Sequence, residues 1–333
     1  MISKSTPFGS ILITGGTGSF GRALVRKILT EARPRRLIVF SRDELKQWEM
    51  QEEFPSSRYP CMRYFLGDVR DVERLRMAFH DVDVVVHAAA LKQVPAAEYN
   101  PFECIQTNVH GAENVVQAAL SAGVARVVAL STDKAVNPVN LYGASKLASD
   151  KIFVAANNLS AGRTKFAVVR YGNVVGSRGS VVPFFRKLIA AGATDLPITD
   201  PRMTRFWITL EDGVRFVLTS LDRMHGGEIF VPKIPSMTIG DLALALAPDL
   251  PHRIVGIRPG EKLHEVMITE DDARNTLEFA DRYVIEPDHE FWGANGAALV
   301  AHGGTRVPDR FRYASDTNPL RMGPEDLRRI LER

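Results

Sequence analysis

The sequence predicts an α/β protein, in which a doubly wound parallel sheet of the Rossmann type is followed by a smaller C-terminal substrate-binding lobe. Three observations lead to this prediction. Short apolar or β-branched segments alternate with amphipathic ones through the first half of the chain, a glycine-rich turn follows the first of them, and the alternation loses its regularity near residue 172. Strands that are apolar on nearly every residue are typical of a parallel sheet covered on both faces. Strand–helix–strand alternation predicts right-handed crossovers and a doubly wound order.

The expected strands of this sheet are short and share the same apolar character. They lie at 11–14, 36–40, 62–66, 82–87, 127–130 and 166–170. Amphipathic stretches at 22–32 and 112–122 are expected to be helices between them, and Gly123 ends the second. Later in the chain we expect helices at 182–191, 210–224 and 239–247 and a strand at 228–231.

These patterns suggest two domains. Residues 1–172 are expected to form an NADP-binding Rossmann domain, and residues 173–333 a substrate-binding lobe. The chain is expected to return to the first domain at about 205–235.

Bulk composition excludes several classes of function. A net charge of +3 over 333 residues leaves no basic stripe for nucleic acid, and no apolar run approaches the roughly 20 residues of a membrane span. The first residues carry no run of signal-peptide type. Cys61 and Cys104 form neither a disulfide framework nor a metal-ligand pattern. We therefore expect a reduced, cytoplasmic protein without a metal ion.

The turn after the first expected strand reads G-G-T-G-S-F-G. Glycines permit a tight turn and let backbone N–H groups approach a pyrophosphate, and the start of the following helix adds its positive dipole end. In the first strand–helix turn of such a pattern this spacing predicts dinucleotide binding. The expected cofactor-binding residues here are Gly15, Thr17, Gly18, Ser19, Phe20 and Gly21.

The end of the second strand indicates which dinucleotide is bound. NAD enzymes usually end this strand with an acid that binds the ribose 2′-OH. Here the strand runs into Ser41 and Arg42, which suit a 2′-phosphate, so NADP is favoured. Asp43 and Glu44 argue for NAD, but they come later and suit a helix cap.

Two further strand ends are expected to contact the cofactor. Asp68 and Val69, after the third strand, are placed to meet the adenine, although Asp68 also suits a helix cap. After the fourth strand, the small side chains of Ala88 and Ala89 allow a close approach to the cofactor ribose. His87, just before them, is interpreted as a structural hydrogen-bonding residue.

A catalytic group follows the fifth strand, where ligands bind in open α/β sheets. Thr132, Asp133 and Lys134 come directly after its apolar run, and Tyr142 and Lys146 follow at a spacing that places both on one helix face. Tyrosine has a pKa near 10, and a neighbouring ammonium favours the phenolate. Tyr142 is therefore the predicted base and Lys146 the group that lowers its pKa. Thr132 is placed to hold a substrate hydroxyl beside Tyr142.

The motifs G-G-T-G-S-F-G, S-T-D-K, Y-G-A-S-K, R-Y-G-N-V and R-P-G-E-K resemble those of the extended short-chain dehydrogenase/reductases. The stretch S-T-D-K-A-x-N-P-x-N-L-Y-G-A-S-K is similar to the inverting UDP-N-acetylglucosamine 4,6-dehydratases of the pseudaminic-acid pathway and their capsule-pathway relatives. The resemblance covers about 11–287. It implies a UDP-sugar substrate, NADP, and a homo-oligomer, either a dimer or a larger ring. Retaining dehydratases typically carry Asp-Glu where this chain has Asp133 and Lys134.

Dehydratase chemistry gives these residues provisional roles. Oxidation at C4 makes the C5 proton acidic, and loss of the C6 hydroxyl then needs a general acid, for which Asp133 is the candidate. Lys134 is the candidate base at C5, with a pKa expected to be lowered by desolvation. Tyr142 is a candidate for returning a proton to C5 from the opposite face. The alternative for Asp133 and Lys134 is an exposed acid–base pair in a loop.

Substrate-side residues are expected on both halves of the chain. The resemblance implies that Lys92 faces the sugar, that Asn173 contacts the diphosphate and that Glu261 binds the ribose hydroxyls. Guanidinium groups match phosphate geometry, so the expected anion-binding residues are Arg178, Arg205 and Arg258. Asn108 is interpreted either as structural or as orienting Lys146 through water.

Three alternatives to the inverting dehydratase remain open on the sequence. A UDP-sugar C4-epimerase or a retaining 4,6-dehydratase would share the cofactor and Tyr142. A non-catalytic NADP-binding scaffold is disfavoured because both Tyr142 and Lys146 are present. The residues alone do not distinguish an N-acetyl group from a hydroxyl at C2 of the sugar.

Overall fold

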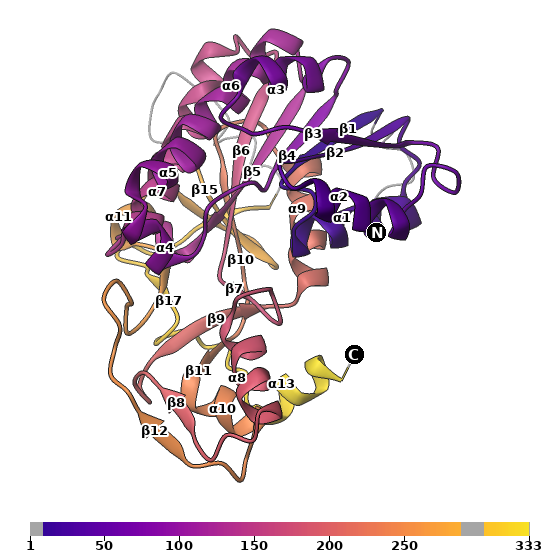
Figure 1. Ribbon diagram of the computed structural model, residues 1–333. Coiled ribbons are helices and arrows are strands. Elements are labelled where there is room, and N and C mark those ends of the chain that lie inside the picture. The colour runs from indigo at the N-terminus through magenta and orange to yellow at the C-terminus, as the bar shows by residue number, and fades with distance from the viewer. Residues whose placement is uncertain (1–8, 288–302, 333) are drawn as a thin grey trace.

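The computed structural model describes residues 9–287 and 303–332, and it places a smaller lobe below one end of a large sheet-centred domain (Figure 1). Residues 1–8, in which no signal peptide is expected, lie outside the described residues. Within the described part of the chain, no helix combines the length and the apolar character needed to cross a bilayer.

The large sheet has ten strands in the order β16-β14-β15-β10-β6-β5-β4-β1-β2-β3. Its parallel part is the doubly wound order expected from the sequence, extended by β10, which pairs parallel to β6. All six expected strands are present, and the fourth begins two residues later than expected. They are β1 (Ser10–Thr14), β2 (Arg36–Ser41), β3 (Met62–Leu66), β4 (Val84–His87), β5 (Arg126–Thr132) and β6 (Lys165–Tyr171).

The chain returns to this sheet twice. The first return is α9 (Leu210–Arg223) followed by β10 (Ile229–Pro232), inside the expected range of 205–235. The second was not anticipated: β14 (Thr276–Glu278), β15 (Arg282–Ile285) and β16 (Thr305–Arg306) form an antiparallel edge beyond β10. Part of the segment that we expected in the lobe therefore extends the large sheet.

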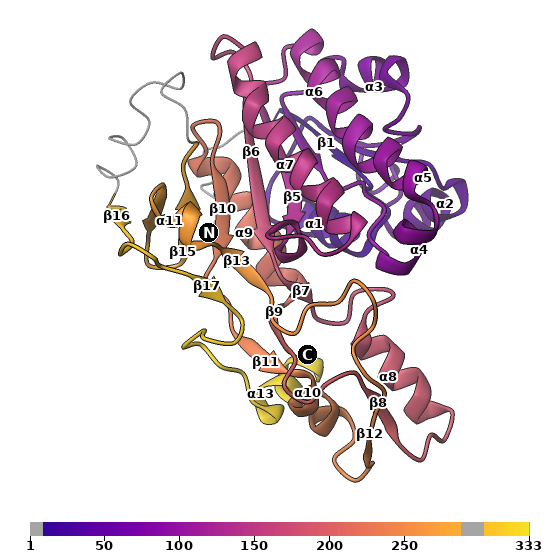
Figure 2. The ribbon, with the colours of Figure 1, turned by 90° about the vertical axis from the view of Figure 1, so that its left-hand side faces the viewer.

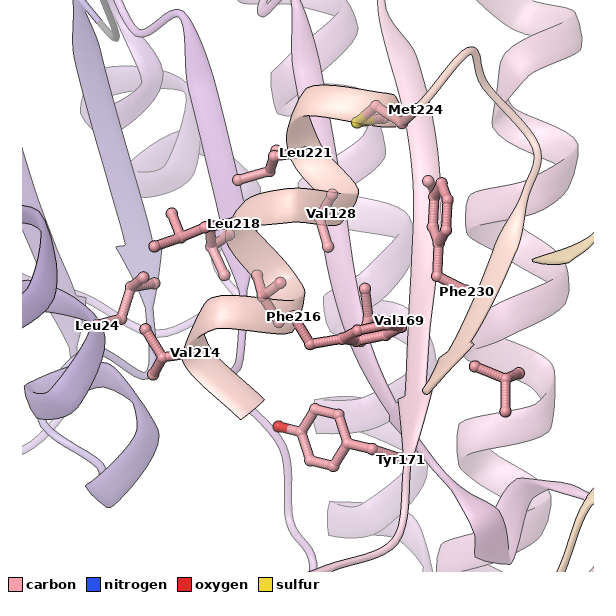
Figure 3. Packing of buried hydrophobic residues seen from close by; sticks show 14 of the residues in the cluster. Leu24, Val128, Val169, Tyr171, Val214, Phe216, Leu218, Leu221, Met224 and Phe230 are labelled. Atoms are coloured by element: carbon pink, nitrogen blue, oxygen red, sulfur yellow. The ribbon is translucent and has the colours of Figure 1, made fainter. Parts of the chain in front are cut away.

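Helices cover both faces of the sheet because each one buries an apolar stripe. On one face lie α1 (Ser19–Glu31), α2 (Glu44–Glu53) and α9. Figure 3 shows Phe216 of α9 beside Val169 of β6, and Val214 of α9 beside Leu24 of α1. The other face is covered by α3 (Val72–Phe79), α6 (Gly111–Ala122) and α7 (Leu141–Leu159). Before α6 come α4 (Val94–Tyr99), α5 (Pro101–Ile105) and a π-helical turn at Gln106–His110.

The lobe has its own apolar core, centred on Trp207, Phe185 and Leu242. A three-stranded sheet joins β7 (Asn173–Val174), β9 (Thr204–Ile208) and β11 (Ser236–Thr238), and β8 (Leu196–Ile198) pairs with β12 (His252–Ile254). Its helices are α8 (Val181–Ala190), α10 (Ile239–Leu246) and α13 (Pro324–Leu331), while α11 (Glu270–Ala273) lies beside the large sheet. The expected helices at 182–191 and 239–247 are thus confirmed.

The junction of the two parts positions the site. The carboxyl ends of β5 and β6 point toward the lobe, and β6 runs almost directly into β7 (Figure 2). Gly172 lies between them, and a Cβ there would be 2.5 Å from Phe206 Cβ, so glycine permits the close approach of β9. The strand β13 (Val266–Ile268) passes the same junction and pairs with β17 (Tyr313–Ala314).

Candidate active site

The glycine-rich turn packs closely against Ala88 and Ala89, which follow strand β4. A dinucleotide site needs such a close backbone approach. Gly15 has φ +65°, and a Cβ on it would be 2.9 Å from the Ala89 Cα. A Cβ on Gly21 would be 2.3 Å from the Gly16 carbonyl oxygen. The helix α1 begins after Gly18 with no side-chain cap and no acid in its first turn, so its first N–H groups remain open to an anion.

His87, the last residue of β4, is hydrogen-bonded to the end of β1 next to this turn. Its Nδ1 lies 2.8 Å from Thr14 Oγ1, which also accepts hydrogen bonds from the backbone N–H groups of Ala88 and Ala89 at 3.2 and 3.3 Å. Burial, with a smaller contribution from the Lys146 charge, lowers the pKa of His87 to about 3. The imidazole is therefore neutral, and the predicted structural role of His87 is confirmed.

At the end of β2, Arg42 reaches the surface beside the glycine-rich turn. Arg42 is about half exposed, with a guanidinium nitrogen 3.4 Å from Asp68 Oδ2. Ser41 is buried, and its Oγ accepts a hydrogen bond of 3.0 Å from Gln47 Nε2. Asp43 is the N-cap of α2, which was one reading of this acid in the sequence.

Asp68 is not a helix cap, because the N-cap of α3 is Asp71. Its Oδ1 accepts a hydrogen bond of 3.0 Å from the Arg70 backbone N–H, and its Oδ2 accepts two from the Arg70 guanidinium. Burial alone would raise the pKa of Asp68, but these bonds and the Arg42 charge hold it below its usual value. An ionised acceptor thus stands next to Val69 at the expected adenine end of the site.

The helix α7, which carries Tyr142 and Lys146, packs on the turn that follows β5. Its N-cap, Asn140, accepts a hydrogen bond of 2.7 Å from the Gly143 N–H. A Cβ at residue 143 would lie 2.2 Å from the Lys134 carbonyl oxygen, so only glycine allows this contact. Tyr142 and Lys146 therefore face the end of β5, as the helical spacing predicts.

The protonation state of Tyr142 differs from the expectation. Burial raises the pKa of Tyr142 to about 12, although the Lys134 charge and a hydrogen bond with Thr132 act in the opposite direction. Burial also lowers the pKa of Lys146, against the opposing charge of Asp150. The expectation that Lys146 holds the phenol pKa below 10 is wrong for the free protein, because desolvation of the phenolate dominates.

Asp133 and Lys134 form an ion pair in which the acid is buried and the lysine side chain is 24% exposed, rather than an exposed loop pair. Asp133 has no exposed surface, and its Oδ1 accepts hydrogen bonds from Thr132 Oγ1 at 2.9 Å and from Lys134 Nζ at 3.0 Å. Its Oδ2 has no hydrogen-bond partner among residues 9–287 and 303–332. Burial and the Glu265 charge raise the pKa of Asp133 against the opposing Lys134 charge. This favours a carboxyl group able to act as an acid.

The expected lowering of the Lys134 pKa is contradicted. Burial alone would lower this pKa, but the charges of Asp133 and Glu265 raise it above the ordinary value for lysine. Lys134 is consequently an ammonium group in the free protein, and it also donates to Asn173 Oδ1 at 3.2 Å. The sequence places Asn173 toward the diphosphate, whereas the structure brings it to Lys134.

Glu265 is a site residue that the sequence interpretation missed. It is 2% exposed, and its carboxylate lies 3.4 Å from Lys134 Nζ, 3.5 Å from Lys262 Nζ and 3.8 Å from Arg205 Nε. The available signal was an acid that leads directly into the apolar strand β13. An ionisable residue at that position needs a buried partner.

Arg205 is not available to an anionic ligand, which corrects its predicted role. It is 6% exposed, and its guanidinium donates to the carbonyl groups of Thr204 at 2.7 Å, Lys262 at 2.9 Å and Leu263 at 3.2 Å. The side chain ties β9 to the segment before β13.

The remaining substrate-side residues lie in two groups. Lys92 and Arg178 both reach the surface. Partial desolvation of the Lys92 ammonium, together with the Arg178 charge, lowers the pKa of Lys92, so the two cations face the same region. Arg258 is 66% exposed and pairs with Glu261, its Nε lying 3.2 Å from Oε1. Arg178 and Arg258 thus remain open to anionic groups of a substrate.

Asn108 links the loop before Lys92 to helix α7. In the π-helical turn, its Oδ1 accepts from the Leu91 N–H at 2.8 Å and its Nδ2 donates to Ser145 Oγ at 2.9 Å. It therefore connects the residue before Lys92 with the residue before Lys146 by direct bonds, which favours the structural reading.

Comparisons with known proteins agree with this arrangement. Residues 11–287 match the family described as polysaccharide biosynthesis protein. An inverting UDP-N-acetylglucosamine 4,6-dehydratase of Campylobacter jejuni is 61% identical over 97% of each chain. A UDP-glucose 4-epimerase of Rickettsia massiliae is 41% identical over 97% of this chain and 95% of its own.

Solved structures show the same fold, in one case over nearly the whole chain and in another over about three quarters of it. Pen from Bacillus thuringiensis superposes with a TM-score of 0.87 at 33% identity, covering 98% of both chains. DesIV, a dTDP-glucose 4,6-dehydratase from Streptomyces venezuelae solved with NAD and TYD bound, has a TM-score of 0.68 at 26% identity, covering 76% of this chain and 86% of its own. The chain therefore belongs to the polysaccharide biosynthesis protein family, within the extended short-chain dehydrogenase/reductases.

Proposed function

We propose that this protein is a UDP-N-acetylglucosamine 4,6-dehydratase that inverts the configuration at C5. The observation that carries the proposal is the ion pair of the buried Asp133 and the partly buried Lys134 beside Tyr142, at the carboxyl end of β5. Removal of water across C5 and C6 needs a base and an acid in addition to the tyrosine that serves oxidation at C4. Relatives that bear this activity in their names support the proposal.

The cofactor is a nicotinamide dinucleotide, and we propose NADP. The turn at Gly15, Gly18 and Gly21 suits its pyrophosphate, and the half-exposed Arg42 suits a 2′-phosphate. When bound, the nicotinamide cofactor would supply a cationic ring and a reversible acceptor for the hydride of the sugar.

Oxidation at C4 is assigned to Tyr142. Thr132 holds the C4 hydroxyl, and the Tyr142 phenolate removes its proton. Because the phenol is protonated in the free protein, it becomes a base only where cationic groups surround it. Lys134 already supplies one such charge.

Elimination uses the hydrogen bond of 3.0 Å between Lys134 Nζ and Asp133 Oδ1. Transfer of one proton along this bond converts the ion pair into a neutral amine and a carboxylic acid. The amine of Lys134 then takes the C5 proton, while Asp133 gives its proton to the C6 hydroxyl, which leaves as water. Both side chains return to their charged forms, so the protons balance.

Inversion follows if the new C5 proton comes from the other face of the sugar. Tyr142 holds the proton taken from the C4 hydroxyl and is assigned to deliver it to C5. The product is a 4-keto-6-deoxy sugar nucleotide with the opposite configuration at C5, and Tyr142 is again a phenolate.

The experiment is incubation of the protein with UDP-N-acetylglucosamine and NADP⁺. We expect a product lighter by one water, with inverted C5 configuration by NMR. An unchanged mass with altered C4 configuration would instead indicate an epimerase, which the Rickettsia relative is named as. Retained C5 configuration would indicate a retaining dehydratase.

The role of Lys134 is tested separately with Lys134→Ala in deuterated water. Loss of deuterium incorporation at C5 is expected, because no base is left to remove the C5 proton. Normal incorporation would remove Lys134 as the base.

The proposal also covers the oligomeric state, the cellular compartment and the pathway of the product. We propose a cytoplasmic homo-oligomer whose product serves pseudaminic-acid and surface polysaccharide synthesis, in line with the family description. Tyr99 and Phe102 on α4 and α5 are 87% and 82% exposed and offer apolar contact area. Light scattering of the purified protein tests the oligomer, and a monomeric mass would exclude it.

A further inference from the structure

The Lys134 ammonium is held by three acceptors from three separate parts of the chain. Asp133 Oδ1 lies 3.0 Å from Nζ, Asn173 Oδ1 3.2 Å, and Glu265 Oε1 3.4 Å. An ammonium group has three N–H donors, so this set matches its full capacity. Of the three, Glu265 reaches the site from the lobe side, directly before β13.

Glu265 and Asp133 have opposite electrostatic surroundings although both are buried carboxyl groups. Glu265 is flanked by Arg205 and Lys262 as well as by Lys134. Burial would raise the pKa of Glu265, but these three cations lower it below its usual value. Asp133 faces only Lys134 among these cations, and burial raises its pKa. A proton that leaves Lys134 is therefore accepted by Asp133, while Glu265 stays ionised.

We propose that Glu265 is a positioning residue that remains a carboxylate throughout the reaction, fixes Lys134 opposite Asp133 and leaves Asp133 as the carboxylate that exchanges a proton with Lys134. The inference deepens the proposed dehydratase and rests on it. Glu265 touches neither substrate nor cofactor in this role. It acts through Lys134, whose amine becomes a stronger base beside a fixed negative charge.

The charged groups around Lys134 predict how the pH profile for water loss changes when the Glu265 charge is removed. The charged or titratable groups that face Lys134 are Asp133 from its own turn, Tyr142 from α7, Arg205 from β9, and Glu265 with Lys262 from the segment before β13. The negative charge of Glu265 raises the pKa values of both Asp133 and Lys134. Removing that charge lowers both, so both limbs of the pH profile for water loss move to lower pH.

The test is Glu265→Gln, assayed for water loss across pH with UDP-N-acetylglucosamine carrying deuterium at C5. We expect kcat to fall roughly ten- to a hundredfold, with an increased isotope effect on C5–H cleavage. The alkaline limb should move down by about one to three pH units. Glu265→Asp keeps the charge and should keep the positions of the limbs while lowering kcat.

A matched control separates positioning from general stability. Glu228 is also buried, and its carboxylate accepts backbone hydrogen bonds from His225 and Gly226 before β10, away from the site. Glu228→Gln should reduce thermal stability but leave the pH profile in place. If Glu265→Gln does not fold, Glu265→Asp decides: a lowered kcat supports the inference, and an unchanged kcat overturns it.

The outcomes distinguish this inference from the proposed function. A parent protein that releases no water from the substrate refutes the dehydratase itself. An active parent combined with unshifted limbs in folded Glu265→Gln refutes only the role of Glu265.

Discussion

Gly143 lies so close to the carbonyl oxygen of Lys134 that a Cβ at residue 143 would stand 2.2 Å from that oxygen. The first turn of the catalytic helix and the turn that carries Asp133 and Lys134 are thus packed backbone to backbone. The relative position of Tyr142 and Lys134 depends on this contact, because neither turn can move independently of the other.

Gly143→Ala is therefore expected to be destabilising. Alanine gains about 1 kcal/mol of helix propensity over glycine, but overpacking against a backbone atom costs about 1–3 kcal/mol and cannot be relieved by a rotamer change. We expect a lower free energy of unfolding in urea and reduced kcat. Gly213→Ala in α9 is the control, since its nearest neighbour would be 3.9 Å away. That variant should be neutral or more stable, and equal behaviour of the two variants would refute the argument.

Arg42→Ala is expected to alter cofactor preference. A charge-assisted hydrogen bond to a 2′-phosphate contributes about 1.5–3 kcal/mol, so the KM for NADP⁺ should rise roughly ten- to a hundredfold. The KM for NAD⁺ should change little, because NAD⁺ lacks that phosphate. Steady-state kinetics with both cofactors measures the ratio, and an unchanged ratio would favour NAD as the natural cofactor.

Arg205 and Arg258 should respond differently to substitution by methionine. Arg205 is buried among carbonyl groups and beside Glu265, so Arg205→Met should cost about 3–5 kcal/mol of stability. Arg258 forms an exposed ion pair worth at most about 1 kcal/mol. Arg258→Met should instead raise the KM for the UDP-sugar. Denaturation curves and substrate titrations of both variants check this, and the reverse assignment would restore Arg205 as a ligand-binding residue.

His87 makes the stability of the protein sensitive to acid. Its pKa is about 3 in the folded protein, well below the ordinary 6.5. The unfolded chain binds a proton first as the pH falls below about 6.5, so stability is lost between there and about pH 3, on the order of 5 kcal/mol. His87→Gln should remove that part of the pH dependence. If the free energy of unfolding falls equally with pH in the parent and in His87→Gln, His87 is not the cause of this acid sensitivity.

The sequence predicted correctly those features that depend on a local residue pattern alone. The six parallel strands and the turn at Gly15 follow from local apolar runs and from glycine geometry. The charge state of Lys134 did not follow, because it depends on the charge of its neighbour Asp133 and on that of Glu265, which reaches the site only through the fold. Arg205 was misjudged for a similar reason: an arginine whose partners are backbone carbonyl groups leaves no partner pattern in the sequence.

The edge strands β14 and β15 were missed because each is very short and lies in a stretch that reads as loop-rich. β15 pairs with β10 and β14 pairs with β15, which joins segments far apart in the chain, and buried residues such as Tyr283 and Val284 complete the core. Pairing of this kind is decided by tertiary packing and not by local propensity.

The most direct test is a single incubation of the parent protein with UDP-N-acetylglucosamine and NADP⁺ in deuterated water, analysed by mass spectrometry and NMR. The account predicts loss of one water, inverted configuration at C5, deuterium at C5 and none at C6, since the C6 hydrogen comes from C4 of the same sugar. An intact substrate mass, or deuterium at C6, would contradict it.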